Sequence, residues 1–118
     1  MLPDYHNSSD LLIDISKNSL YSKLIIQLNK DFGLVNLDIN LPENSTPSLI
    51  KEELKKVVKN LILTDLNNYK NLLYIIDFHE VMTFKKEASN IDIYTESIVF
   101  LILKRVWKKV WFKANYYT

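Results

Sequence analysis

The sequence predicts an all-α fold, a small bundle of four helices plus a short N-terminal helix, with an extended linker around residues 34–46. Several segments place apolar side chains three and four residues apart, which is the spacing of one helix face. The chain has one glycine in 118 residues, so few positions can adopt the positive φ angles that tight β-hairpins require. Hydrophobic residues make up 47% and charged residues 25%, which is typical of a globular protein with a core.

The length of 118 residues suits a single helical domain spanning 1–118, with residues 1–7 and 115–118 expected to fray. The absence of cysteine excludes disulfides and cysteine-ligated metal sites. The N-terminus lacks the positive flank and apolar run of a signal peptide. The longest strongly apolar run, Ile98 to Leu103, is far shorter than the ~20 residues that cross a bilayer. We therefore expect a cytoplasmic protein without a transmembrane segment.

Two helices are predicted in the first third of the chain. Residues 8–17 read SSDLLIDISK and predict a short helix with Ser8 or Ser9 as its N-cap. Residues 19–32 predict a second helix. Its apolar positions at helical spacing are Leu20, Leu24, Ile25, Leu28 and Phe32. Gly33 is expected to end this helix in the left-handed conformation.

Residues 34–46 show a different pattern, in which apolar and polar side chains alternate strictly. Alternation is typical of a strand, but a lone strand has no obvious partner in this chain. We interpret the segment as an extended linker whose apolar side chains fill gaps between helices. The alternative is an α+β fold with a short strand at 35–41 pairing with 72–78.

Residues 47–63 give the clearest helix prediction. Thr46 is a suitable N-cap and Pro47 suits the first helical position. The apolar stripe comprises Ile50, Leu54, Val57, Val58, Leu61 and Ile62. A further helix is predicted from Thr64 or Asp65 to about residue 79, followed by a charged loop over 83–92.

The last helix is predicted to begin at one of residues 95–97, and it separates apolar from basic side chains. Its apolar side comprises Val99, Phe100, Leu103, Val106, Trp107, Val110, Trp111 and Ala114. Its other side carries Lys104, Arg105, Lys108, Lys109 and Lys113, with Phe112 projecting among them. The turn at 98–102 is apolar all round, so it should be covered by the fold or by a second subunit.

The basic side is also where the charge of the chain is uneven. Residues 97–118 hold five cations and no acid, which leaves ten cations and fourteen acids in residues 1–96. Three interpretations are open. In the first, the lysines form the solvated outer face of a core helix, which is the ordinary arrangement. In the second, they bind the phosphates of a nucleic acid while Phe112, Tyr116 and Tyr117 stack on its bases. In the third, the helix lies on an anionic membrane or in the groove of a partner.

Residues suited to catalysis, metal binding or cofactor binding are scarce in this chain. A single glycine excludes glycine-rich phosphate loops and dinucleotide-binding fingerprints. The chain has only two histidines, and His79 lies in the one crowded titratable segment, between Asp77 and Glu80. We interpret that segment as a helix end that enters a loop. We expect no catalytic residue, metal site or cofactor.

The sequence therefore predicts a non-enzymatic protein that acts through protein–protein interaction, with self-association through the C-terminal aromatic and basic helix as one form. The alternative is sequence-tolerant binding of nucleic acid or of an anionic membrane surface by residues 104–113. In either case the expected interaction residues are Lys104, Arg105, Lys108, Lys109, Phe112 and Lys113.

Overall fold

The computed structural model describes residues 5–76 and 90–116. Within these ranges the chain forms five helices and no strand. The helices are α1 (Ser8–Ser16), α2 (Tyr21–Gly33), α3 (Pro47–Thr64), α4 (Leu66–Ile75) and α5 (Ile91–Tyr116). The all-α prediction is confirmed. The alternative strand at 35–41 is wrong, because that segment is turn and extended linker and the proposed partner residues 72–75 are helical.

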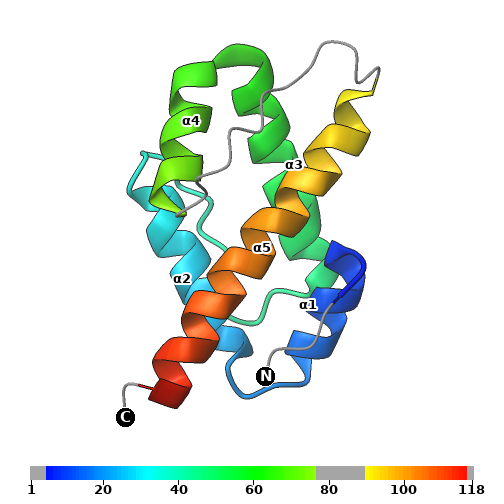
Figure 1. Cartoon of the computed structure of the whole chain (residues 1–118), viewed down its shortest axis with the longest axis vertical. Helices are drawn as coiled ribbons and strands as arrows, with labels where there is room; N and C mark the ends of the chain where they lie inside the picture. Colours follow the sequence, from blue (N-terminus) through cyan, green and yellow to red (C-terminus); the bar gives the residue numbers. More distant parts are fainter. Residues whose placement is uncertain (1–4, 77–89, 117–118) are drawn as a thin grey trace.

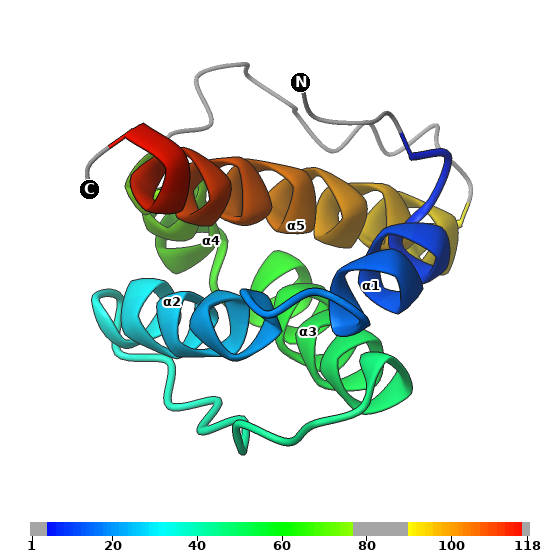
Figure 2. The same cartoon turned by 90° about the horizontal axis from the view of Figure 1, so that it is seen from below.

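Helix α5 organises the molecule. Figure 1 shows it running diagonally across the other helices, and α1, α2 and α3 all pack against it. Figure 2 shows α2 and α3 between α5 and the 34–46 linker, which lies on the far side. Helix α4 packs on α3 and α2. Every helix contributes to the core, whose largest fully buried side chains are Leu11, Leu12, Ile15, Leu24, Ile25, Leu28, Phe32, Ile50, Leu54, Leu72, Ile98 and Ile102.

The N-cap of α1 differs from the prediction. Asn7, rather than Ser8 or Ser9, caps the helix, and its Oδ1 accepts a hydrogen bond from the backbone N–H of Asp10 at 2.8 Å. Asparagine and serine are equally good N-caps, so the local sequence does not select between adjacent candidates. Ser8 is fully buried instead and donates to Glu96 on α5.

The prediction for Gly33 is also wrong. Gly33 is the last residue of α2 and does not have a positive φ. The chain reverses a few residues later, where Asn36 and Asn40 have φ angles of 62° and 45°. Asparagine tolerates the left-handed region because its short side chain can hydrogen-bond locally. The left-handed positions in this linker therefore do not depend on glycine.

The linker is held against the helices as predicted, by apolar side chains that fill gaps. Val35 and Leu41 are buried in the core. The side chain of Asn29 on α2 pairs with both backbone groups of Leu41, donating at 2.9 Å and accepting at 2.8 Å. Asn68 on α4 donates to the carbonyl of Val35 at 3.0 Å. Because side chains satisfy these backbone groups, the segment needs no neighbouring strand.

Helix α3 begins as predicted. The Thr46 hydroxyl accepts from the backbone N–H of Leu49 at 3.2 Å, and Pro47 is the first helical residue. Helix α4 follows after Asp65, which caps it by accepting from Asn68 at 3.1 Å. However, α4 ends at Ile75 rather than near residue 79. Asp77, His79, Glu80 and most of the predicted 83–92 loop lie outside the described residues.

Helix α5 begins at Ile91, four residues before the predicted start, so residues 91–92 are helical rather than loop. The side chain of Asn90 explains this. Its Oδ1 accepts from the backbone N–H of Asp92 at 2.9 Å and of Ile93 at 3.4 Å, which satisfies donors that the first helical turn leaves free. At the other end the helix continues through Tyr116, into the segment expected to fray.

Candidate functional site

The apolar side of α5 belongs to the core. Val99, Leu103 and Val106 are at most 1% exposed, and Trp107 is 5% exposed. Trp111 lies at the edge and is half-buried. In the apolar turn at 98–102, Ile98, Val99 and Ile102 are buried by the chain itself. Of the two expected sources of cover, the fold and a second subunit, the fold itself therefore buries most of this turn.

The basic side faces outward. Lys104, Lys108, Lys109 and Lys113 are exposed and Arg105 is half-buried. Among the described residues, Lys104, Lys108 and Lys113 form no ion pair. Three cations of the predicted set are thus available to an external partner.

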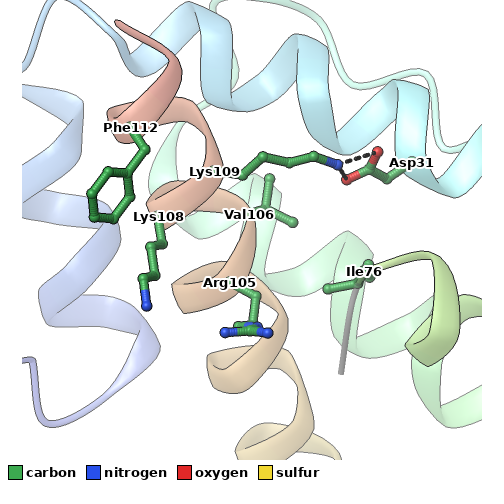
Figure 3. Close-up of a pocket in the computed structure, with 7 residues that line it drawn as sticks. All are labelled: Asp31, Ile76, Arg105, Val106, Lys108, Lys109 and Phe112. Atoms are coloured by element: carbon green, nitrogen blue, oxygen red, sulfur yellow. Dashed lines mark hydrogen bonds and ion pairs between the residues drawn. The ribbon is translucent and has the colours of Figure 1, made fainter. Parts of the chain in front are cut away.

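A surface pocket of about 300 Å³ lies beside these lysines. Its described lining consists of Asp31 from α2, Ile76 at the end of α4, and Arg105, Val106, Lys108, Lys109 and Phe112 from α5 (Figure 3). Four of the six predicted interaction residues therefore line one pocket. The lining combines three cations and one carboxylate with three apolar side chains.

Lys109 has a different role from the other lysines. It extends from α5 towards α2 (Figure 3), where its ammonium group lies 3.3 Å from both carboxylate oxygens of Asp31. Asp31 is 1% exposed and also accepts a hydrogen bond from Gln27 at 2.8 Å. A buried carboxylate needs such partners, because transfer out of water disfavours its charge. Lys109 therefore ties α5 to α2, which the sequence pattern does not reveal.

Phe112 is half-buried and belongs to an ordered row of side chains on α5. The row consists of Phe100, Lys104, Lys108, Phe112 and Tyr116, which recur every four residues. The ammonium of Lys104 lies 5.0 Å from the ring centroid of Phe100, and that of Lys108 lies 5.9 Å from Phe112. The Phe112 and Tyr116 rings stack at 5.1 Å. We call this set the aromatic–lysine row. Tyr117, the other expected stacking residue, lies outside the described residues.

A polar cluster at the opposite end of α5 escaped prediction. Glu96 lies 2.8 Å from the ammonium of Lys51 and 2.9 Å from that of Lys55, both on α3. It also accepts from the Ser8 hydroxyl of α1 at 3.2 Å. The hydrogen bonds from Lys51 and Lys55 lower the pKa of Glu96 from 4.5 to about 2. Its three partners come from distant segments, so only the Glu96 charge itself was visible in the sequence.

The described residues offer no evident metal centre, since no three histidine, aspartate or glutamate side chains among them are grouped to hold an ion. Likewise, no helix within 5–76 or 90–116 combines the length and apolar character needed to span a bilayer.

No protein-family model, curated protein or solved structure matches this chain. The features of the chain that bear on function are the pocket, the aromatic–lysine row and the three lysines that form no ion pair with the described residues.

Proposed function

We propose that this protein is non-enzymatic and binds an acidic segment of another protein with the C-terminal half of α5. The observation that carries the proposal is the pocket, whose lining places cations beside apolar side chains. Lys108 in this lining, and Lys104 and Lys113 elsewhere on the basic side of α5, have no acidic partner among the described residues. Complementary charge steers partners together and fixes their register, while buried aromatic contacts supply affinity.

The chemistry of the pocket favours a polypeptide over a phosphate chain. Ile76, Val106 and Phe112 give the pocket an apolar lining that suits a side chain. The carboxylate of Asp31 also lines it, so an uncharged side chain suits the interior of the pocket better than a phosphate group. Protein interfaces are commonly enriched in aromatic residues and arginine, which matches Phe112, Tyr116 and Arg105.

Self-association through the turn at 98–102 has less support, because Ile98 and Ile102 are each only 1% exposed within one chain. Membrane-surface binding is similarly weakened. It requires the apolar side of α5 to enter the lipid interface, and Trp107 on that side is 5% exposed. A different protein is therefore the partner that we propose.

Single-stranded nucleic acid is the second candidate, and the aromatic–lysine row supports it. The row spans about 24 Å along the helix axis, from the helical rise per residue. It places two lysines between Phe100 at one end and the stacked rings of Phe112 and Tyr116 at the other, and Tyr116 is 66% exposed. Rings that stack on bases and lysines that contact phosphates are the usual components of sequence-tolerant binding.

The test compares polyglutamate, oligothymidylate and anionic lipid vesicles as ligands at low and at physiological salt. We expect the protein to bind polyglutamate most tightly, and the triple variant Lys104→Glu, Lys108→Glu, Lys113→Glu to lose this binding. A matched triple variant, Lys17→Glu, Lys23→Glu, Lys70→Glu, changes three exposed lysines outside α5 by the same charge. It should bind almost normally.

Other outcomes are equally informative. Tighter binding of oligothymidylate, with a steep loss at higher salt, would transfer the proposal to nucleic acid. Sedimentation that reports dimers dissociating in the α5 variant would identify a second copy as the partner. Equal losses in both triple variants would contradict a specific role for α5.

A further inference from the structure

We infer that the pocket between α2, α4 and α5 anchors the interface by taking one large apolar side chain, such as phenylalanine, from an acidic peptide segment. This inference rests on the proposed function and specifies the segment that the site recognises. The six interaction residues predicted from the sequence then have two different roles. The pocket residues select a side chain, and the remaining lysines attract the surrounding charge.

The size of the pocket supports a single anchoring side chain. Its volume of about 300 Å³ lies at the lower end of the ~300–1,000 Å³ range of small-ligand sites. The apolar lining is also limited, since it comes from Ile76, Val106 and Phe112. Phe112 already contacts Trp111 edge-on, with ring centroids 5.2 Å apart, so a second aromatic group at the pocket can extend an existing ring cluster.

The charges around the pocket give the peptide a direction. Asp31 on α2 lies on one side, where it is already bonded to Lys109 and Gln27. Lys108 lies on the other side beside Phe112 (Figure 3), and it forms no ion pair among the residues of 5–76 and 90–116. A carboxylate next to the anchoring side chain is repelled by Asp31 and attracted by Lys108. The acidic neighbours should therefore lie on the Lys108 side.

The chain contains a matched comparison for this site. Lys104 and Lys108 are both exposed, and each places its ammonium near a phenylalanine ring. Phe100 and Phe112 are both half-buried. Only Lys108 and Phe112 line the pocket, whereas Lys104 and Phe100 lie outside its described lining. General attraction to the basic side of α5 involves both lysines, but anchoring in the pocket involves only Lys108.

The experiment measures the fluorescence anisotropy of a labelled, end-blocked peptide with the sequence DEFED added to the full chain. The first control replaces the central phenylalanine by alanine, and the second replaces the four acids by lysine. We expect the alanine peptide to bind about tenfold more weakly, as for loss of an anchoring aromatic side chain. The lysine peptide should not bind.

The protein variants then locate the contact. Lys108→Glu and Phe112→Leu should each weaken DEFED binding about tenfold or more, whereas Lys104→Glu and Phe100→Leu should change it about threefold or less. Thermal unfolding followed by circular dichroism verifies that each variant is folded. Phe112→Leu and Phe100→Leu have the same change in volume, so a packing defect alone affects both.

The outcomes separate this inference from the proposed function. Equal losses in Lys104→Glu and Lys108→Glu, or equal binding of the phenylalanine and alanine peptides, would overturn the anchoring pocket while leaving an acid-binding surface. Binding of polyglutamate without binding of DEFED would do the same. Failure of both ligands to bind would overturn both proposals.

Discussion

Glu96 lies where α1, α3 and α5 meet, and at the scale of single residues it joins more than one neighbouring helix to α5. Its carboxylate contacts Ser8, Lys51 and Lys55, which come from two other helices. Its side chain is 34% exposed, so water screens part of each interaction. The cluster nevertheless joins three helices through one side chain, and its contribution should depend on pH.

The pKa of Glu96 is lowered to about 2 in the folded protein. A lowered folded pKa contributes stability above the ordinary carboxyl pKa, and this contribution is lost as the pH falls towards 2. We expect Glu96→Gln to reduce the free energy of unfolding by about 1 kcal/mol at neutral pH, after allowance for screening. It should also flatten the decline in stability between about pH 4.5 and pH 2.

Urea denaturation at a series of pH values measures both effects. Glu52→Gln provides the control, since Glu52 is an exposed glutamate of α3 and should leave the pH dependence almost unchanged. If Glu96→Gln retains the full decline below pH 4.5, the cluster is not the source of acid sensitivity.

At the scale of helices and linkers, the sequence predicted the kind of element well and its ends less well. Apolar spacing identified α3 and the buried side of α5, because periodicity is repeated over many residues. The end of a helix depends on a single capping residue, and asparagine is that residue at more than one helix here. Asn7 and Asn90 cap helices, while Asn36 and Asn40 adopt the left-handed conformation that we predicted for Gly33. In a chain with twelve asparagines, many equivalent candidates compete.

Asn90 tests this argument at the start of α5. Its side chain accepts hydrogen bonds from two backbone donors of the first turn. Asn90→Ala should therefore lower the free energy of unfolding by about 1 kcal/mol, whereas Asn90→Ser, which retains a capping oxygen, should cost only a few tenths. Urea denaturation gives the free energies, and amide hydrogen exchange at residues 92–94 reports the first turn directly.

An alanine variant with unchanged stability and unchanged exchange would contradict capping by Asn90. The helix would then begin near residues 95–97, as its sequence alone suggested.

At the scale of the whole molecule, the structure resolves how the uneven charge of the chain is distributed. The sequence left open whether the basic side of α5 is an ordinary solvated face or is offered to a partner. The first turns of α5 carry Asp92 and Glu96, which pair with Lys51, Lys55 and Lys59 of α3. On the basic half of α5, Lys109 pairs with Asp31. These pairings join segments far apart in sequence, so they followed from the packing of the helices and not from any local pattern.

The contrast between local sequence pattern and helix packing also explains which parts of the candidate site could be predicted. The basic and apolar sides of α5 follow from helical periodicity within one segment, and the structure bears them out in the burial of Val106 and the exposure of Lys104. The pocket also needs Asp31 and Ile76 from two other helical regions. Their proximity depends on how α2 and α4 pack, which a single sequence does not determine.

This distribution of charge predicts that one set of three lysines stabilises the fold and that another set of three binds a partner. Lys51, Lys55 and Lys59 form ion pairs across α3 and α5 at 2.8–2.9 Å, whereas Lys104, Lys108 and Lys113 form none with the described residues. Replacing each set by glutamine removes the same charge from the protein.

We expect the variant with Lys51, Lys55 and Lys59 replaced, the α3 variant, to lose about 1 kcal/mol of stability at low salt and less at high salt, because exposed pairs contribute little each and are screened. The α5 variant should stay within about 0.5 kcal/mol of the original protein while losing polyglutamate binding. Urea denaturation at two salt concentrations, with binding measured on the same samples, distinguishes the two sets. A large loss of stability in the α5 variant would mean that its lysines support the fold, and the surface that we assign to a partner would then be part of the protein's own structure.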